Sequence, residues 1–214
     1  MLDRWGRLGS LVAGVLFVVL LAVGFVLSGN TPNSDSSGLK VISYYHSHNG
    51  RLTAAAYLIT LSLFFGLFFF GSLRGYLRQS AVAERLAAVA LAGGVLFAAA
   101  GALAAGSLFA LADVPAKLTS GAAQALNVIQ SDLATGALLA GLGVVYMASG
   151  LAIERSRLLP RWLGWVSIVL GVVALTPIGW LTLFALAVWT LIVSALIYRR
   201  SNGAADAPSP APAA

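Results

Sequence analysis

The sequence has no cysteine. Disulfides, zinc–thiolate sites, iron–sulfur clusters and cysteine nucleophiles are therefore excluded. Charge is also scarce, since Asp, Glu, Lys and Arg make up 9% of the 214 residues, against about 25% in an ordinary soluble domain. Hydrophobic residues make up 59%, and a soluble chain of this size cannot hide so much apolar surface from water. The composition therefore predicts an exterior that faces lipid.

Long apolar runs account for most of the chain, and a helix needs about 20 apolar residues to cross a bilayer. The run over 8–28 is longer than the apolar core of a signal peptide and ends in turn residues, which predicts a retained span. The last run is too long for one span and contains Thr176-Pro177-Ile178-Gly179, which favours a tight hairpin. One kinked, strongly tilted helix is the alternative. The sequence predicts an all-α, polytopic transmembrane helical bundle of six spans: 8–28, 52–73, 86–112, 120–153, 162–176 and 179–198.

Positive charges alternate between the ends of the predicted spans. Ten lie in the segments that six spans place in the cytoplasm: Arg4, Arg7, Arg74, Arg78, Arg85, Arg155, Arg157, Arg161, Arg199 and Arg200. Three lie in the outer segments: Lys40, Arg51 and Lys117. Cytoplasmic loops carry the Lys/Arg excess in membrane proteins, so both termini are predicted to be cytoplasmic. The excess of Arg over Lys, with abundant Ala, Gly, Leu and Val, favours a bacterial source and hence the inner (cytoplasmic) membrane.

Two sizeable segments outside the predicted spans are the outer loop and the C-terminal tail. The outer loop 29–51 begins with turn residues and continues with Leu39, Ile42 and Tyr45, a spacing that predicts a short amphipathic helix on the membrane interface. The C-terminal segment 201–214 consists mostly of Ala, Pro and Ser and is predicted to be disordered.

Polar residues gather at two places on the outer side. The predicted ligand-binding residues are Asp132, Asn127, Ser131, Gln124, His46, His48 and Tyr45. Gln124, Asn127 and Ser131 follow steps of three and four, so they share a helix face. Asp132 is a carboxylate at the edge of a span, where acids often mark ion paths; the alternative is that it lies in water and begins the span.

His46 and His48 are the only histidines of the chain. An i, i+2 pair without cysteine or a nearby acid in sequence does not predict a metal site, and no metal is expected. The alternative for both is a solvated interfacial loop.

Small residues recur with helical spacing in the third and fourth spans. They let helix backbones approach closely in lipid, so these spans are expected to pack on each other, or one of them on a second protomer. The predicted helix-packing residues are Gly94, Ala98, Ala102, Gly106, Gly136, Gly143 and Gly150.

Three motifs carry a family resemblance. They are Tyr44-Tyr45-His46-Ser47-His48-Asn49-Gly50-Arg51 before the second span, Ala125-Leu126-Asn127 with Asp132 in the fourth, and Leu159-Pro160-Arg161-Trp162-Leu163-Gly164-Trp165 at the fifth. In these motifs the chain resembles an actinobacterial family of uncharacterised multispanning membrane proteins, a domain of unknown function. The resemblance covers most of the chain except the tail, and it implies an architecture without an activity, substrate or cofactor.

Three classes of function compete. We favour binding or transport of a small solute or ion through an outer polar cap. The alternative is a non-catalytic membrane component that packs with lipids, with a partner membrane protein or as a homo-oligomer. An enzyme that uses His46 or His48 as a base ranks last, because no nucleophile motif, paired carboxylates or metal spacing supports it. We expect no enzymatic activity, no cofactor and no nucleic-acid partner, and the lipid bilayer as the surroundings.

Overall fold

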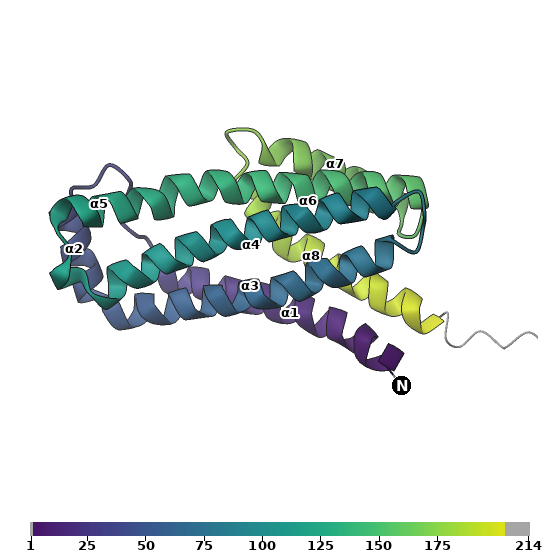
Figure 1. The fold of residues 1–214 in the computed structure, drawn as a ribbon, viewed down its shortest axis with the longest axis horizontal. Helices are drawn as coiled ribbons and strands as arrows, with labels where there is room; N and C mark the ends of the chain where they lie inside the picture. Colours follow the sequence, from purple (N-terminus) through teal and green to yellow (C-terminus); the bar gives the residue numbers. More distant parts are fainter. Residues whose placement is uncertain (1, 204–214) are drawn as a thin grey trace, which may run out of the picture.

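The computed structural model describes residues 2–203, and within them the chain is all-α, with no strand. The long helices run side by side along one axis, as Figure 1 shows. They are α1 (Leu2–Ser28), α3 (Asn49–Leu77), α4 (Glu84–Asp113), α6 (Ala134–Ser156), α7 (Arg161–Ala174) and α8 (Leu181–Gly203).

Five helical stretches are long and apolar enough to cross a membrane. They are Leu11–Ser28, Asn49–Leu77, Glu84–Asp113, Ser120–Ser156 and Leu181–Arg200. The sixth apolar helix, α7, has 14 residues and so is only about 21 Å long. By length and composition the chain is a membrane-spanning helical protein.

The predicted break in the last apolar run is confirmed. α7 ends at Ala174 and α8 begins at Leu181, with turns over Leu175–Trp180 between them. Gly179 packs so closely on the carbonyl of Ala174 that a side chain there would collide with it. α8 continues through residues 201–203, which were predicted as tail; the rest of that segment lies outside the described residues.

Each long helix packs on the next in the order α8, α1, α3, α4, α6 and α7. The series closes where the indole N–H of Trp189 on α8 donates to Ser167 Oγ on α7 at 2.8 Å. Aromatic rings fill the centre of the bundle, mostly in edge-to-face pairs. Such pairs stabilise a fold by more than the burial of their apolar area alone. These rings belong to Phe17, Phe69, Phe70, Phe97, Tyr146 and Trp189.

The tightest contact between α4 and α6 is made by two glycines. A Cβ on Gly141 would lie 2.5 Å from Phe97 N, and one on Gly93 would lie 2.8 Å from Val145 N. The two helices therefore meet backbone to backbone, as expected for these spans, but neither of these glycines is among the predicted packing residues.

The predicted small residues face several directions. Gly94 packs on the Phe70 ring, and Gly143 and Gly150 pack on α7, while Ala98 is buried. Ala102 and Gly106 are exposed, because a four-residue step turns about 400° and the row drifts about 120° round the helix from Gly94 to Gly106.

Gly136 shares the face of Gly143, but it is exposed and has no neighbour within 4 Å. The reason is that the α7–α8 turn meets α6 at Gly143 and does not reach Gly136. Leu175 lies against Gly143, and Tyr146 OH donates to the Thr182 carbonyl at 3.1 Å. The part of α6 from Ala134 to Leu142 therefore extends past the hairpin.

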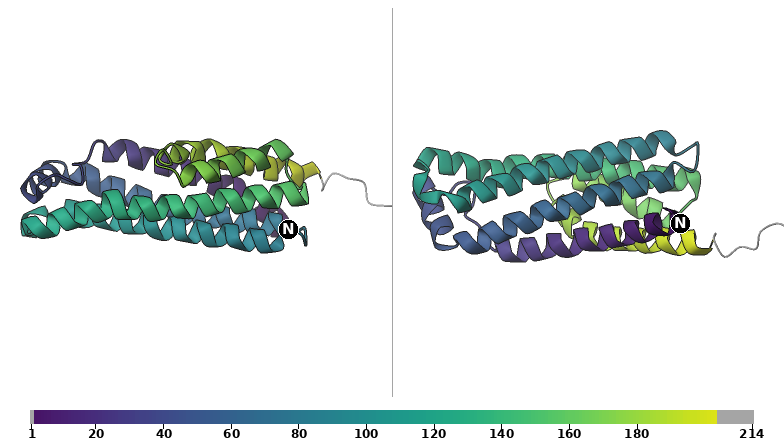
Figure 2. Two further views of the ribbon diagram at one scale, coloured as in Figure 1. Left: turned by 90° about the horizontal axis from the view of Figure 1, so that it is seen from above. Right: turned by 60° about the horizontal axis from the view of Figure 1, so that its bottom comes forward.

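The two ends of the bundle differ in kind. The start of α1, the α3–α4 turn, the α6–α7 turn and the end of α8 lie at one end, which we call the arginine end (Figures 1 and 2). There the Leu158 carbonyl accepts hydrogen bonds from Tyr76 OH and Arg200, and Arg161 pairs with Glu154 at 3.0 Å. At the opposite end lie α2 (Gly38–Ser47), η1 (Pro115–Lys117), α5 (Ser120–Val128) and the loop 29–37, which together we call the cap.

Candidate functional site

The cap is a packed unit. α2 lies against α5 and η1, and the Gly38 backbone touches the Ser120 carbonyl so closely that only glycine fits. The helix predicted in this loop is confirmed, but its buried face carries Val41 and Tyr45, while Leu39 is 72% exposed. The predicted apolar face was therefore wrong by about one residue, because the buried face of α2 is set by its contacts with α5 and η1.

The loop 29–37 closes the cap over the bundle. Gly29 ends α1 in the left-handed conformation, with φ of 60°, which glycine adopts without strain. Asn127, which is 1% exposed, donates through Nδ2 to the carbonyls of Asn33 at 2.9 Å and Pro32 at 3.3 Å. Asn127 therefore anchors this loop, which we call the lid, to α5.

α5 and α6 are joined by a π-helical turn, η2 (Ile129–Leu133), in which the Ala134 N–H donates to the Ile129 carbonyl five residues back. Such turns rotate the following side chains relative to a regular α-helix and are frequent at functional sites. This one carries Gln130, Ser131 and Asp132.

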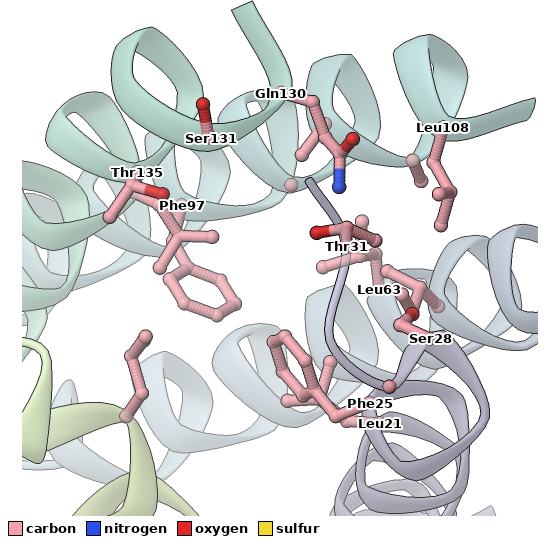
Figure 3. Close-up of a pocket in the computed structure, with 17 residues that line it drawn as sticks. Leu21, Phe25, Ser28, Thr31, Leu63, Phe97, Leu108, Gln130, Ser131 and Thr135 are labelled. Carbon is pink, nitrogen blue, oxygen red and sulfur yellow. The ribbon is translucent and has the colours of Figure 1, made fainter. Parts of the chain in front are cut away.

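Beneath the lid and η2 lies a cavity of about 280 Å³. Its walls are mostly apolar, and Figure 3 shows the Phe25 and Phe97 rings projecting into it. The apolar lining consists of Leu21, Phe25, Ile59, Leu63, Phe97, Gly101, Ala104, Ala105, Leu108, Leu138 and Leu183. Five polar side chains line it as well: Ser28, Thr31, Gln130, Ser131 and Thr135.

Gln130 has unused hydrogen-bonding capacity in this cavity, as do the Thr31 and Thr135 hydroxyls, which make no hydrogen bond within residues 2–203. The Gln130 Oε1 accepts from Tyr45 OH at 2.8 Å, which fixes the amide and leaves Nε2 without a hydrogen-bond acceptor among residues 2–203. Figure 3 shows this amide directed into the cavity, toward Thr31. By contrast, Ser28 and Ser131 donate their protons to the Gly24 and Asn127 carbonyls at 2.9 and 2.8 Å.

The cavity lining contains no charged side chain. Asp132 is exposed and lies with Asp35 on a shallow polar depression outside the lid. Thr31 and Ser131 line both the depression and the cavity, so they separate the two. Gln124 is exposed on α5, and it lines neither.

The aromatic and histidine residues of the cap do not converge on one point. Tyr45 is fully buried, and burial, with a smaller effect of Tyr44, raises the pKa of its hydroxyl. Tyr44 stacks on His48 at 4.5 Å between ring centroids, and His48 Nδ1 lies 2.9 Å from the Tyr44 carbonyl. His46 is exposed. Within residues 2–203, no three His, Asp or Glu side chains come together as metal ligands would.

Sequence reasoning placed polar residues at this end of the bundle but did not select Gln130 for the site. A regular helix puts Gln130 about 100° from Ser131, whereas the π turn brings both side chains to the cavity. Thr31 and Ser28 were missed because only the fold brings the end of α1 beneath η2. The one available signal was the polar run Gln130-Ser131-Asp132 inside an apolar segment.

The chain matches no protein-family model, no curated protein and no solved structure. The resemblance to an actinobacterial family therefore stays a prediction, and the functional argument depends on the geometry alone.

Proposed function

We propose that this protein binds a small uncharged molecule, with an apolar body and one hydrogen-bonding end, in the cavity beneath its cap. The unused Gln130 Nε2 at an otherwise largely apolar cavity is the observation that carries the proposal. Gln130 is partly buried, so a ligand oxygen that accepts from Nε2 would add a net hydrogen bond of about 0.5–1.5 kcal/mol. Ligand sites typically have this character, with apolar walls and a few directed polar groups.

An ion fits the cavity poorly. Moving a charge out of water into an apolar site without a countercharge costs at least several kcal/mol, and the lining offers no countercharge. The proposal therefore narrows the predicted solute or ion to a neutral solute.

We also propose the six-span arrangement, with the arginine end in the cytoplasm of a bacterium and the cap outside. Supporting it, the described segments that carry the arginine excess share one end of the bundle. The α7–α8 hairpin then supplies the fifth and sixth spans, and the cap stands at the outer surface.

The binding test uses glycerol monobutyrate, a short neutral ester, as the probe and butyrate as its charged counterpart. The full chain is purified in detergent, and ligand binding is measured as a rise in its unfolding temperature. We expect the ester to stabilise the protein and butyrate to have no effect. Equal stabilisation by butyrate would contradict a neutral site.

Gln130→Leu is expected to weaken binding of the ester about 3–10-fold, the equivalent of about 0.5–1.5 kcal/mol for one hydrogen bond. The matched control is Gln79→Leu, in the exposed α3–α4 turn at the arginine end, which should bind as the unchanged protein does. Tyr45→Phe removes the bond to Oε1 but keeps the amide, so it separates loss of the donor from loss of its tether. Unchanged affinity in Gln130→Leu would refute the proposed role of this amide.

A further inference from the structure

A groove of about 430 Å³ runs along the side of the bundle between α1 and α8. Apart from the indole nitrogen of Trp180, its lining side chains are purely hydrocarbon. Phe184 and Val26 on its rim are 71% and 79% exposed, so this surface faces the bilayer interior in a membrane-spanning bundle.

The groove adjoins the cavity beneath the cap. Leu21, Phe25 and Leu183 line both spaces, so their side chains form part of the wall between them. Phe25 is half exposed, and the other two are partly buried. Rotamer changes of such side chains occur within nanoseconds, so this wall yields without movement of a helix.

The short α7 leaves this side of the cavity uncovered. The α7–α8 turn meets α6 at Gly143, about 16 Å along the helix from Asp132. Between that turn and the cap, Thr135 and Leu138 of α6 face Leu183 of α8 across the cavity. If α7 were long enough to reach the cap, it would close this side of the cavity. Because α7 is short, the fold leaves an opening toward lipid.

The polar end of the cavity lies where the polar end of a lipid would sit. Ser28 and Gly29, at the last turn of α1, line it together with Gln130. The groove follows α1 from Val26 back to Phe17, away from the cap. One molecule can therefore place a polar end at Gln130 and a hydrocarbon chain along α1.

We propose that the ligand is a neutral single-chain lipid, such as a fatty-acid ester of glycerol. Its hydrocarbon chain lies in the α1–α8 groove, and an oxygen of its polar end accepts a hydrogen bond from Gln130 Nε2. This inference rests on the proposed function and adds the ligand class and its route from the bilayer. A phospholipid fits this site less well, because the cavity lining offers its phosphate no cation. The Arg51 guanidinium lies against Gly29, which lines the cavity, but it donates to Tyr44 OH at 3.2 Å and does not itself line the cavity.

The test is photo-crosslinking in phosphatidylcholine vesicles that contain the full chain. The probe is a monoacylglycerol with a diazirine in the middle of its chain. We expect crosslinks within 17–26 of α1 and 180–187 of α8, and at least fivefold loss of labelling when unlabelled monoacylglycerol is added. The exposed surface at Phe64 and Phe68 on α3 reports non-specific lipid contact, and its labelling should not respond to the competitor.

Ala22→Trp fills the groove without altering the cavity, because Ala22 lines only the groove. It should lower specific crosslinking at least fivefold, whereas Val23→Trp, on the exposed neighbouring position that lines neither space, should not. Labelling spread evenly over α1, α8 and α3, or labelling insensitive to competitor and to Ala22→Trp, would overturn the inference.

Failure of this inference is distinguishable from failure of the proposed function. The four-carbon ester is short enough to bind in the cavity alone, and Thr135→Phe should abolish its binding by filling the cavity, with Gly136→Phe as the outward-facing control. If the short ester binds but the crosslinks are not specific, the cavity site stands and the lipid assignment falls. If the short ester does not bind at all, the cavity site itself is refuted.

Discussion

Replacement of Gly141 by alanine tests the contact between α4 and α6 directly. The added methyl group would lie 2.5 Å from Phe97 N, 3.0 Å from Phe97 Cα and 2.9 Å from the Gly93 carbonyl oxygen. All three are backbone atoms of α4, so no side chain can rotate away. The two helices must therefore separate by about 1 Å to restore van der Waals contact.

Gly136→Ala is the matched control on the same helix. Nothing lies within 4 Å of the methyl group that it adds. Both variants gain the helix propensity of alanine over glycine, about 1 kcal/mol, so that this gain cancels in the comparison. The difference between them is the cost of overpacking, about 1–3 kcal/mol, and Gly141→Ala should be the less stable by that amount.

The measurement is unfolding by sodium dodecyl sulfate in mixed micelles, followed by tryptophan fluorescence. Trp189 lies in the core at 5.3 Å from Tyr146, between ring centroids, so its emission should report separation of the helices. Gly94→Ala should fall between the two variants, because its methyl group would meet the Phe70 ring, a side chain that can shift. Equal stability of Gly141→Ala and Gly136→Ala would refute close backbone contact between α4 and α6.

Two further predictions concern the cap and the topology. Asn127→Ala removes both hydrogen bonds to the lid carbonyls of Pro32 and Asn33 and should destabilise the cap by about 1–3 kcal/mol. Amide hydrogen exchange should become faster over 29–37 and stay unchanged at the arginine end. Equal protection of the lid in the variant and the unchanged protein would contradict the anchoring role of Asn127. Because the chain has no cysteine, Gln124→Cys and Gln79→Cys each introduce one labelling site. A membrane-impermeant maleimide should label the first in intact cells and the second only after lysis, and labelling of both in intact cells would rule out the proposed topology.

The lengths of the apolar runs were enough to predict most of the long helices. The break at Thr176–Gly179 was predictable because proline and glycine act locally on the backbone. The face of α2 was not, since Val41 and not Leu39 is buried only because α5 and η1 lie beside it.

Spacing predicted small residues at helix contacts but not the partner of each. Gly143 contacts α7, whereas Gly136, on the same face, projects past the end of the α7–α8 hairpin. The reach of a neighbouring helix decides such a contact, and it depends on where that helix ends in space.

The absence of cysteine excludes thiol chemistry, and the scarcity of charge together with the long apolar runs determines an apolar helical protein. Those conclusions need only composition and local period, because transfer free energies and backbone preferences act residue by residue. The cavity is different, since it depends on a π turn, on a hydrogen bond between residues 45 and 130, and on a hairpin that turns short of the cap. The hydrogen bond and the hairpin join segments far apart in the chain, and the π turn borders a cavity only because residues of α1, α3 and α4 also line it. Only the tertiary structure therefore decides that Gln130 faces a cavity and that this cavity adjoins the α1–α8 groove.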